Sequence, residues 1–137
     1  VIANQSGNAG QQSLAVTLRG IVLNQVRSNL TPRLILREGV VGFLNGIIAG
    51  ILVGGVVTAL QIYSGDGSWR LGAVIGISMT CSLTVATLTG AGLPLLMKKC
   101  EFDPATASTI FLTMVTDSVS FLMFLGLAAA LSHWIIT

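Results

Sequence analysis

Three apolar stretches, each longer than a membrane crossing needs, constrain this chain more than any other feature. They cover residues 34–63, 69–97 and 104–134. A helix needs about 20 residues to cross the hydrocarbon core of a bilayer, and the separators at 64–68 and 98–103 are rich in turn formers or charge. Only 9% of the residues are charged, whereas a soluble domain carries about 25%. The sequence therefore predicts one polytopic, all-α transmembrane domain over residues 1–137.

Residues 1–27 carry too many polar side chains for a lipid-facing span, yet these side chains follow a helical pattern. Four of them repeat at the i, i+4, i+7, i+8 spacing of one helix face: Asn4, Asn8, Gln11 and Gln12. An amphipathic helix on the membrane surface would carry Lys and Arg on that face, whereas this face carries amides. We therefore expect a further helix that is buried in the bundle, with its amide face toward water or a partner.

The basic residues predict the orientation of the spans, because cytoplasmic loops are enriched in Lys and Arg. Five of them flank two of the connections: Arg27, Arg33, Arg37, Lys98 and Lys99. Segments 28–34 and 98–103 are therefore predicted to be cytoplasmic, and segment 64–68 and the C-terminus to lie outside. If residues 1–27 also span the membrane, residue 1 lies outside, and we expect another span to precede it.

Small and hydroxyl-bearing residues predict close helix packing in the middle of the chain. Four glycines follow one another at four-residue spacing: Gly42, Gly46, Gly50 and Gly54. A smooth face of this kind lets helix backbones approach closely in lipid. The next span carries six hydroxyls: Ser78, Thr80, Ser82, Thr84, Thr87 and Thr89. We expect most of these hydroxyls to bond to backbone carbonyls one turn back, and we assign neither set any chemistry.

Asp117 is the one formal charge in the apolar run from 111 to 131. It belongs to a polar stripe at helical spacing: Thr109, Thr113, Thr116, Asp117 and Ser120. At a rise of 1.5 Å per residue it lies about 20 Å into its helix, beyond the middle of the membrane. A charge there costs at least ~2.5–3.5 kcal/mol, which favours a functional site. The structural alternative is a protonated Asp117 that bonds to a Ser or Thr across a helix contact.

Other function classes fit the residues less well. An intramembrane aspartyl protease needs two carboxylates that share a proton, and a dimer would have to supply the second one. A structural assembly module would explain the glycine face, but it explains neither the two polar stripes nor the charge. Binding of nucleic acid is not indicated, because the chain has no basic stripe and few aromatic side chains.

Two motifs in combination resemble the membrane domain of MgtE-type magnesium transporters, to which eukaryotic solute carrier family 41 is related. They are "SGNAGQQSLAVTLRGI", from residue 6, and "DPATASTIFLTMVTDSVSFLMFLGLA", from residue 103, and the resemblance extends from Val1 to about Ala130. It implies a non-enzymatic, five-helix domain that crosses a bacterial or archaeal inner membrane and forms a homodimer with a pore on the two-fold axis. Under this resemblance the chain supplies helices two to five, without the first helix and without the cytosolic regulatory domains of the family.

The resemblance also implies a set of site residues. The pore magnesium site corresponds to Asp117 and the backbone of Thr113, and Asp103 at the cytoplasmic end would also contact the ion. The G-N-A-G helix would line the pore through Asn8, Gly10 and Gln11. The remaining pore-lining candidates come from the stripe around Asp117: Thr109, Thr116 and Ser120. Mg²⁺ is a hard ion that prefers oxygen ligands and gives up water reluctantly, so two copies of Asp117 and these polar groups would hold hydrated Mg²⁺. Asp103 also has a purely structural explanation, because Asp followed by Pro is a good helix start.

Overall fold

The computed structural model describes residues 1–25, 31–65 and 69–132, and over these residues the chain forms long α-helices and no strand. The helices are α1 (Ile2–Val22), α2 (Thr31–Tyr63), α3 (Arg70–Lys99) and α4 (Pro104–Ala130). The predicted all-α bundle is therefore confirmed. The predicted loops at 28–34 and 64–68, and the predicted end of the last span at 134, fall largely outside the described residues.

The helix ends differ from the predicted ones where local backbone geometry intervenes. α1 ends at Val22 rather than at residue 27, because the next backbone bonds leave the helical pattern: Asn24 donates its N–H to the Ile21 carbonyl at 3.1 Å, and Gln25 donates to the Gly20 carbonyl at 2.9 Å. Asn24 then takes a φ of 52°, the left-handed conformation that commonly stops a helix and that Asn tolerates. α2 begins at Thr31, earlier than predicted, since Pro32 in the first turn needs no hydrogen-bond partner for its nitrogen.

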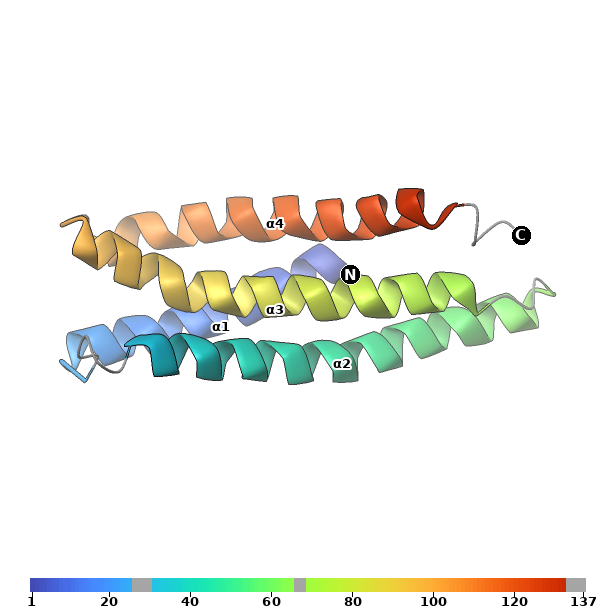
Figure 1. Ribbon diagram of the computed structural model, residues 1–137, viewed down its shortest axis with the longest axis horizontal. Coiled ribbons are helices and arrows are strands. Elements are labelled where there is room, and N and C mark those ends of the chain that lie inside the picture. The colour runs from blue at the N-terminus through green and yellow to red at the C-terminus, as the bar shows by residue number, and fades with distance from the viewer. Residues whose placement is uncertain (26–30, 66–68, 133–137) are drawn as a thin grey trace.

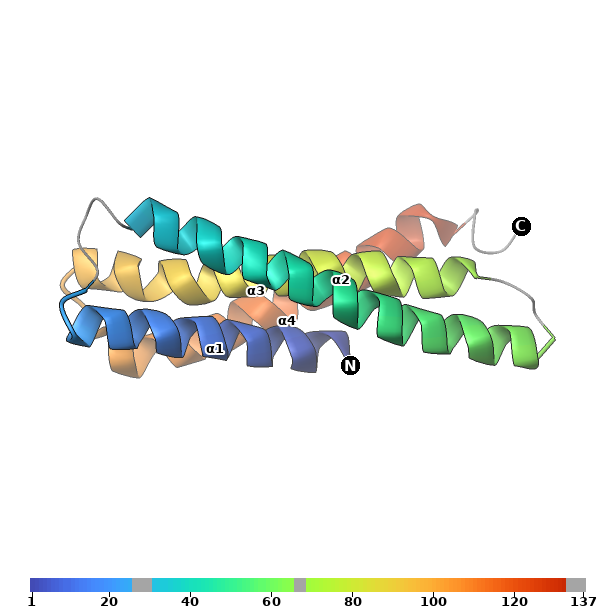
Figure 2. The ribbon, with the colours of Figure 1, turned by 90° about the horizontal axis from the view of Figure 1, so that it is seen from below.

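α3 is the central helix of the elongated bundle. It packs against each of the other three helices, and α1 also packs against α4. Figure 1 shows α3 between α2 and α4, with α1 behind, and Figure 2 shows α1 running beside the others over part of their length. The first residue consequently lies near the middle of the bundle's long axis rather than at one end.

Three of the helices are long and apolar enough to cross a membrane, as the sequence predicts. Among the described residues these are Thr31–Tyr63, Arg70–Lys99 and Thr109–Ala130. Their outward faces carry large apolar side chains such as Ile51, Leu52 and Leu122, each more than 60% exposed on the isolated chain. Lipid would cover such faces without cost, because lipid tails are as apolar as these side chains.

The glycine face of α2 packs directly on α3. Apart from Glu38, every buried residue of α2 is a glycine: Gly39, Gly42, Gly46, Gly50 and Gly54. A Cβ atom on Gly46 would lie 2.7 Å from the Thr80 Cα, and one on Gly50 would lie 2.7 Å from the Gly76 carbonyl oxygen. The predicted packing role of these glycines is confirmed, since any side chain there would push the two backbones apart.

The hydroxyls of α3 bond mostly to their own helix, which confirms the second packing prediction. Ser78 Oγ donates to the Val74 carbonyl at 2.7 Å, and Thr84 Oγ1 donates to the Thr80 carbonyl at 2.7 Å. Thr80 and Thr89 make the same i−4 bond, at 2.9 and 2.8 Å. These groups are satisfied inside the helix, so they do not require a ligand.

Candidate functional site

The contact between α1 and α4 is polar and buried, and it joins the polar stripe of α4 to the face of α1 opposite the predicted amide stripe, whose four residues are exposed. Ser6 Oγ and Ser120 Oγ lie 2.6 Å apart, and both side chains are at most 2% exposed. Ser120 Oγ also lies within bonding distance of the Thr116 carbonyl, at 2.7 Å, and Ser6 Oγ of the Ala3 carbonyl, at 3.0 Å. This cluster joins the G-N-A-G helix to the helix that carries Asp117.

Gly10 lies where α1, α3 and α4 meet. A Cβ atom there would lie 3.1 Å from the Ala86 carbonyl oxygen and 3.2 Å from the Leu112 Cδ1. One turn further along, Ser13 Oγ donates to the Thr87 carbonyl at 2.9 Å and ties α1 to α3. The absence of a side chain at Gly10 therefore allows α1 to approach both neighbouring helices.

Three of the predicted pore-lining residues are thus enclosed by helices of their own chain: Gly10, Thr116 and Ser120. Thr116 Oγ1 donates to the Thr113 carbonyl at 3.1 Å, and its methyl group faces Gly10. Helix packing accounts for the position of all three within one chain. Their pore-lining role stays a prediction.

The other members of the two stripes are exposed on the chain: Asn8, Gln11, Thr109, Thr113 and Asp117. The polar stripe of α4 is therefore divided along its length. Its Thr116 and Ser120 edge is covered by α1, while its Thr113 and Asp117 edge is open. An open polar edge on a membrane helix needs water, an ion or another protein surface beside it.

Asp117 makes no hydrogen bond or ion pair with the residues that the structure describes. The structural alternative, a protonated Asp117 bonded to a Ser or Thr of another helix, is not seen within this part of the chain. Thr113, one turn earlier, donates its hydroxyl to the Thr109 carbonyl at 3.0 Å. The carboxylate oxygens of Asp117 are therefore available to a ligand.

Asp103 lies at the far end of α4 and does not share a site with Asp117 in one chain. It is exposed and immediately precedes Pro104, the first residue of the helix, as predicted for a helix start. At 1.5 Å per residue the two aspartates are about 21 Å apart along the axis. Among the described residues, no group of three or more His, Cys, Asp or Glu side chains could hold a metal ion. Within the described residues, one chain therefore provides isolated carboxylates and no cluster of side chains that could replace the water around a metal ion.

Glu38 is a buried carboxylate that the sequence analysis missed. It is 8% exposed and precedes Gly42 by one turn, on the glycine face that packs against α3. At Gly39, a Cβ atom would lie 2.7 Å from the Leu88 Cδ2, so the two helices are close here as well. The four-residue spacing from Glu38 through the glycines is the signal that identifies its face. Hydropathy hides it, because one acidic residue barely changes the average of so apolar a stretch.

Comparisons with known proteins identify relatives along nearly the whole chain. The MgtE divalent cation transporter family matches residues 1–127. The magnesium transporter MgtE of Enterococcus faecalis is 36% identical over 140 aligned residues, which include 99% of this chain and 29% of the relative. The magnesium transporter MgtE of Bacillus subtilis is 32% identical over 133 residues, which include 97% of this chain and 28% of the relative. The Thermus thermophilus protein of the same name is 30% identical over 131 residues, or 96% and 28% of the two chains. The chain thus spans less than a third of the length of these relatives.

Proposed function

Because this chain belongs to the MgtE family of divalent cation transporters, we propose that it moves Mg²⁺ across a membrane. With its three candidate spans, the chain is part of a multi-pass membrane protein. The family consists of transporters rather than enzymes, so the aspartyl protease considered from the sequence is set aside. The placement of the acidic residues agrees, since Asp117 on α4 and Glu38 on α2 have α3 between their helices (Figure 1).

The observation that carries the proposal is the exposed carboxylate of Asp117 on an otherwise apolar helix. A charge that faced lipid would cost several kcal/mol, and no hydrogen bond with the described residues offsets that cost. The cost is removed if the carboxylate faces a wet pore that holds a cation. Asp117 would then supply the negative charge that favours cations in the pore.

A homodimer is the assembly that best supports such a pore. Two copies of Asp117 on a two-fold axis would give two negative charges for one divalent ion. The open edge of α4, with Thr113 beside Asp117, and the exposed amides Asn8 and Gln11 of α1 would surround the ion with oxygen acceptors. Mg²⁺ gives up its bound water reluctantly. These groups would therefore bind the hydration shell rather than replace it.

The buried residues of the two stripes would position the exposed ones. The contact of Ser6 with Ser120, and the close approach at Gly10, hold α1 against α4. Thr109, which is exposed on α4, would line the pore directly, whereas Thr116 and Ser120, which α1 covers, would support the pore wall from behind. Asp103, at the predicted cytoplasmic end, would give the ion a second carboxylate. A cytosolic regulatory domain in the longer protein would act on this end.

The test is Mg²⁺ flux into liposomes that contain the purified full-length protein, followed with a Mg²⁺-sensitive dye inside them. Asp117→Asn preserves the shape and removes the charge, so it should abolish most of the flux while the protein stays folded. Ser118→Ala, the neighbouring position off the stripe, should leave the flux unchanged. Equal transport by Asp117→Asn and the parent protein would refute the role of Asp117.

A further inference from the structure

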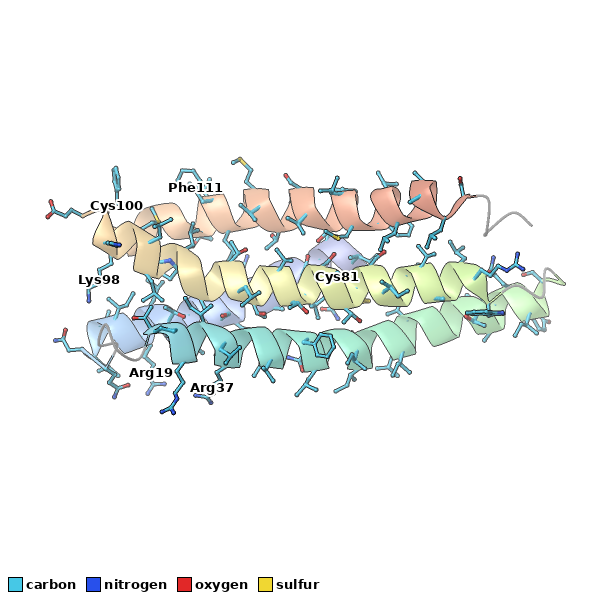
Figure 3. The ribbon with its side chains drawn as sticks, in the orientation of Figure 1. Arg19, Arg37, Cys81, Lys98, Cys100 and Phe111 are labelled. Atoms are coloured by element: carbon cyan, nitrogen blue, oxygen red, sulfur yellow. The ribbon has the colours of Figure 1, made fainter. Side chains whose placement is uncertain are left out.

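A cavity of about 410 Å³ lies between the end of α1 and the start of α2, away from the proposed ion path. Arg19 from α1 and Arg33 and Arg37 from α2 line it, with Gln25 beside them and Val16 and Leu34 as apolar walls. Figure 3 shows Arg19 and Arg37 on the same side and at the same end of the bundle. Three arginine side chains, all exposed, therefore line one small space.

The described residues around this cavity do not balance its charge. None of those that line it is acidic, and none of the three arginines forms a salt bridge within the described part of the chain. Glu38, the acidic residue nearest in sequence, lies on the side of α2 that packs against α3. Three like charges repel one another unless an anion lies between them. A cluster of three positive charges repels Mg²⁺ and attracts an anion.

The position of the cavity selects the kind of anion. It lies at the end of the bundle that also carries Lys98 (Figure 3), where the apolar part of α2 begins. Exposed apolar side chains, including Leu36 and Val40, continue from it along the outer surface of α2. The arginines of the cavity would match the charged headgroup of a lipid. The exposed apolar side chains of α2 that continue from the cavity would match its acyl chains.

We propose that this cavity binds the phosphate of an anionic phospholipid. The guanidinium fork matches phosphate oxygens in a bidentate manner, and basic pockets between membrane helices on the cytoplasmic side bind lipid headgroups. A bound lipid would also link two helices that share little direct contact, since α1 and α2 are not among the main packed pairs of the bundle. The lipid therefore stabilises the attachment of α1 to α2.

The experiment compares lipid binding and thermal stability of the full-length protein, purified in detergent and stripped of lipid. Phosphatidylglycerol, phosphatidylcholine and inorganic phosphate are added separately, and lipid adducts are counted by native mass spectrometry. Phosphatidylglycerol should form adducts and raise the midpoint of thermal unfolding, whereas phosphatidylcholine should do neither. The double variant Arg33→Gln/Arg37→Gln should bind phosphatidylglycerol about 25-fold more weakly, or about fivefold for each arginine.

The matched control is Lys98→Gln/Lys99→Gln, which removes the same charge at the same end but outside the cavity. It should retain the adducts, and Arg33→Lys/Arg37→Lys, which preserves the charge, should retain most of the binding. The proposal is overturned if phosphatidylcholine binds the parent as well as phosphatidylglycerol does, or if the lysine-to-glutamine control loses as much binding as the arginine variant. A thermal shift of the same size from inorganic phosphate alone would assign the cavity to a soluble anion and would also overturn it.

Discussion

Ser6 and Ser120, 114 positions apart in the sequence, bring their Oγ atoms to within 2.6 Å of each other in the buried contact of α1 with α4. Asn8 follows Ser6 by two positions, and Asp117 precedes Ser120 by three. The pair therefore fixes the relative position of the helices that carry the exposed amides and the exposed carboxylate. The proposed ion site depends on this contact, although neither serine is a ligand.

Asp117→Glu should reduce Mg²⁺ flux and broaden ion selectivity. The substitution retains the charge but moves it outward by one methylene, so water-mediated contacts tuned to one distance no longer fit. The measurement is Mg²⁺ flux in the presence of competing Mn²⁺ or Ca²⁺, compared with the parent and with Ser118→Ala. Unchanged flux with unchanged competition would contradict a distance-dependent role for this carboxylate.

A second copy of the chain should lie against the open edge of α4. In a protein with Cys81→Ala and Cys100→Ser, the variant Thr113→Cys should be linked into a dimer by a bis-maleimide, whose spacer can bridge a pore that holds a hydrated ion. Leu122→Cys, also exposed but on another face of α4, is the control and should stay monomeric on the gel. Native mass spectrometry that found only monomer in an actively transporting preparation would refute the homodimer.

The two ends of the bundle should lie on opposite sides of the membrane, with segment 98–103 in the cytoplasm. Cys100 is exposed at this end, and Ser64→Cys would report on the other, because both residues are exposed. An impermeant maleimide applied to intact cells should label Ser64→Cys and spare Cys100, in a Cys81→Ala background. Ser28 and Gly67 belong to the segments predicted to lie in the cytoplasm and outside, and single cysteines there should label from opposite sides, but both positions lie outside the described residues. Labelling of both cysteines from outside would contradict the prediction that the two ends of the bundle lie on opposite sides of the membrane.

Gly90→Ala should destabilise the protein by about 1–3 kcal/mol, the usual cost of overpacking. A Cβ atom on Gly90 would meet the Gly10 carbonyl oxygen and the Ser13 Cβ, so α1 would have to move away from α3. Gly92→Ala is the control on the same helix, since a Cβ atom there meets nothing within 4 Å. Unfolding by denaturing detergent measures both variants, and equal stability of the two would show that α1 does not need this close approach.

The spans were predictable because length and hydropathy alone decide them. Stretches of this length have no other stable environment than a bilayer, and the glycine spacing on α2 identified its packing face correctly. The end of α1 was not predictable in the same way. Polar residues such as Asn24 and Gln25 follow Val22, so the sequence pattern does not show where the helix ends. The left-handed backbone of Asn24 shows it.

The candidate site could be predicted only in part, because periodicity identifies a face but not which edge of it a neighbour covers. Thr116 and Asp117 belong to one stripe, yet α1 buries the first and leaves the second open. That division depends on where Ser6 and Gly10 contact α4, a tertiary relationship between distant parts of the chain. Glu38 was missed for a related reason: its four-residue spacing from Gly42 identifies its face, but only the structure shows that α3 covers the carboxylate there.

The polar character of α1 also has a consequence for biosynthesis. Among the described helices, α2, α3 and α4 contain segments apolar enough to enter the bilayer independently, and α1 does not. The helices that hold α1 in place, α3 and α4, emerge from the ribosome after it. The contacts of α1 with α3 and α4 can therefore form only after α4 has been made, so the docking of α1 on these two helices is a late step of folding.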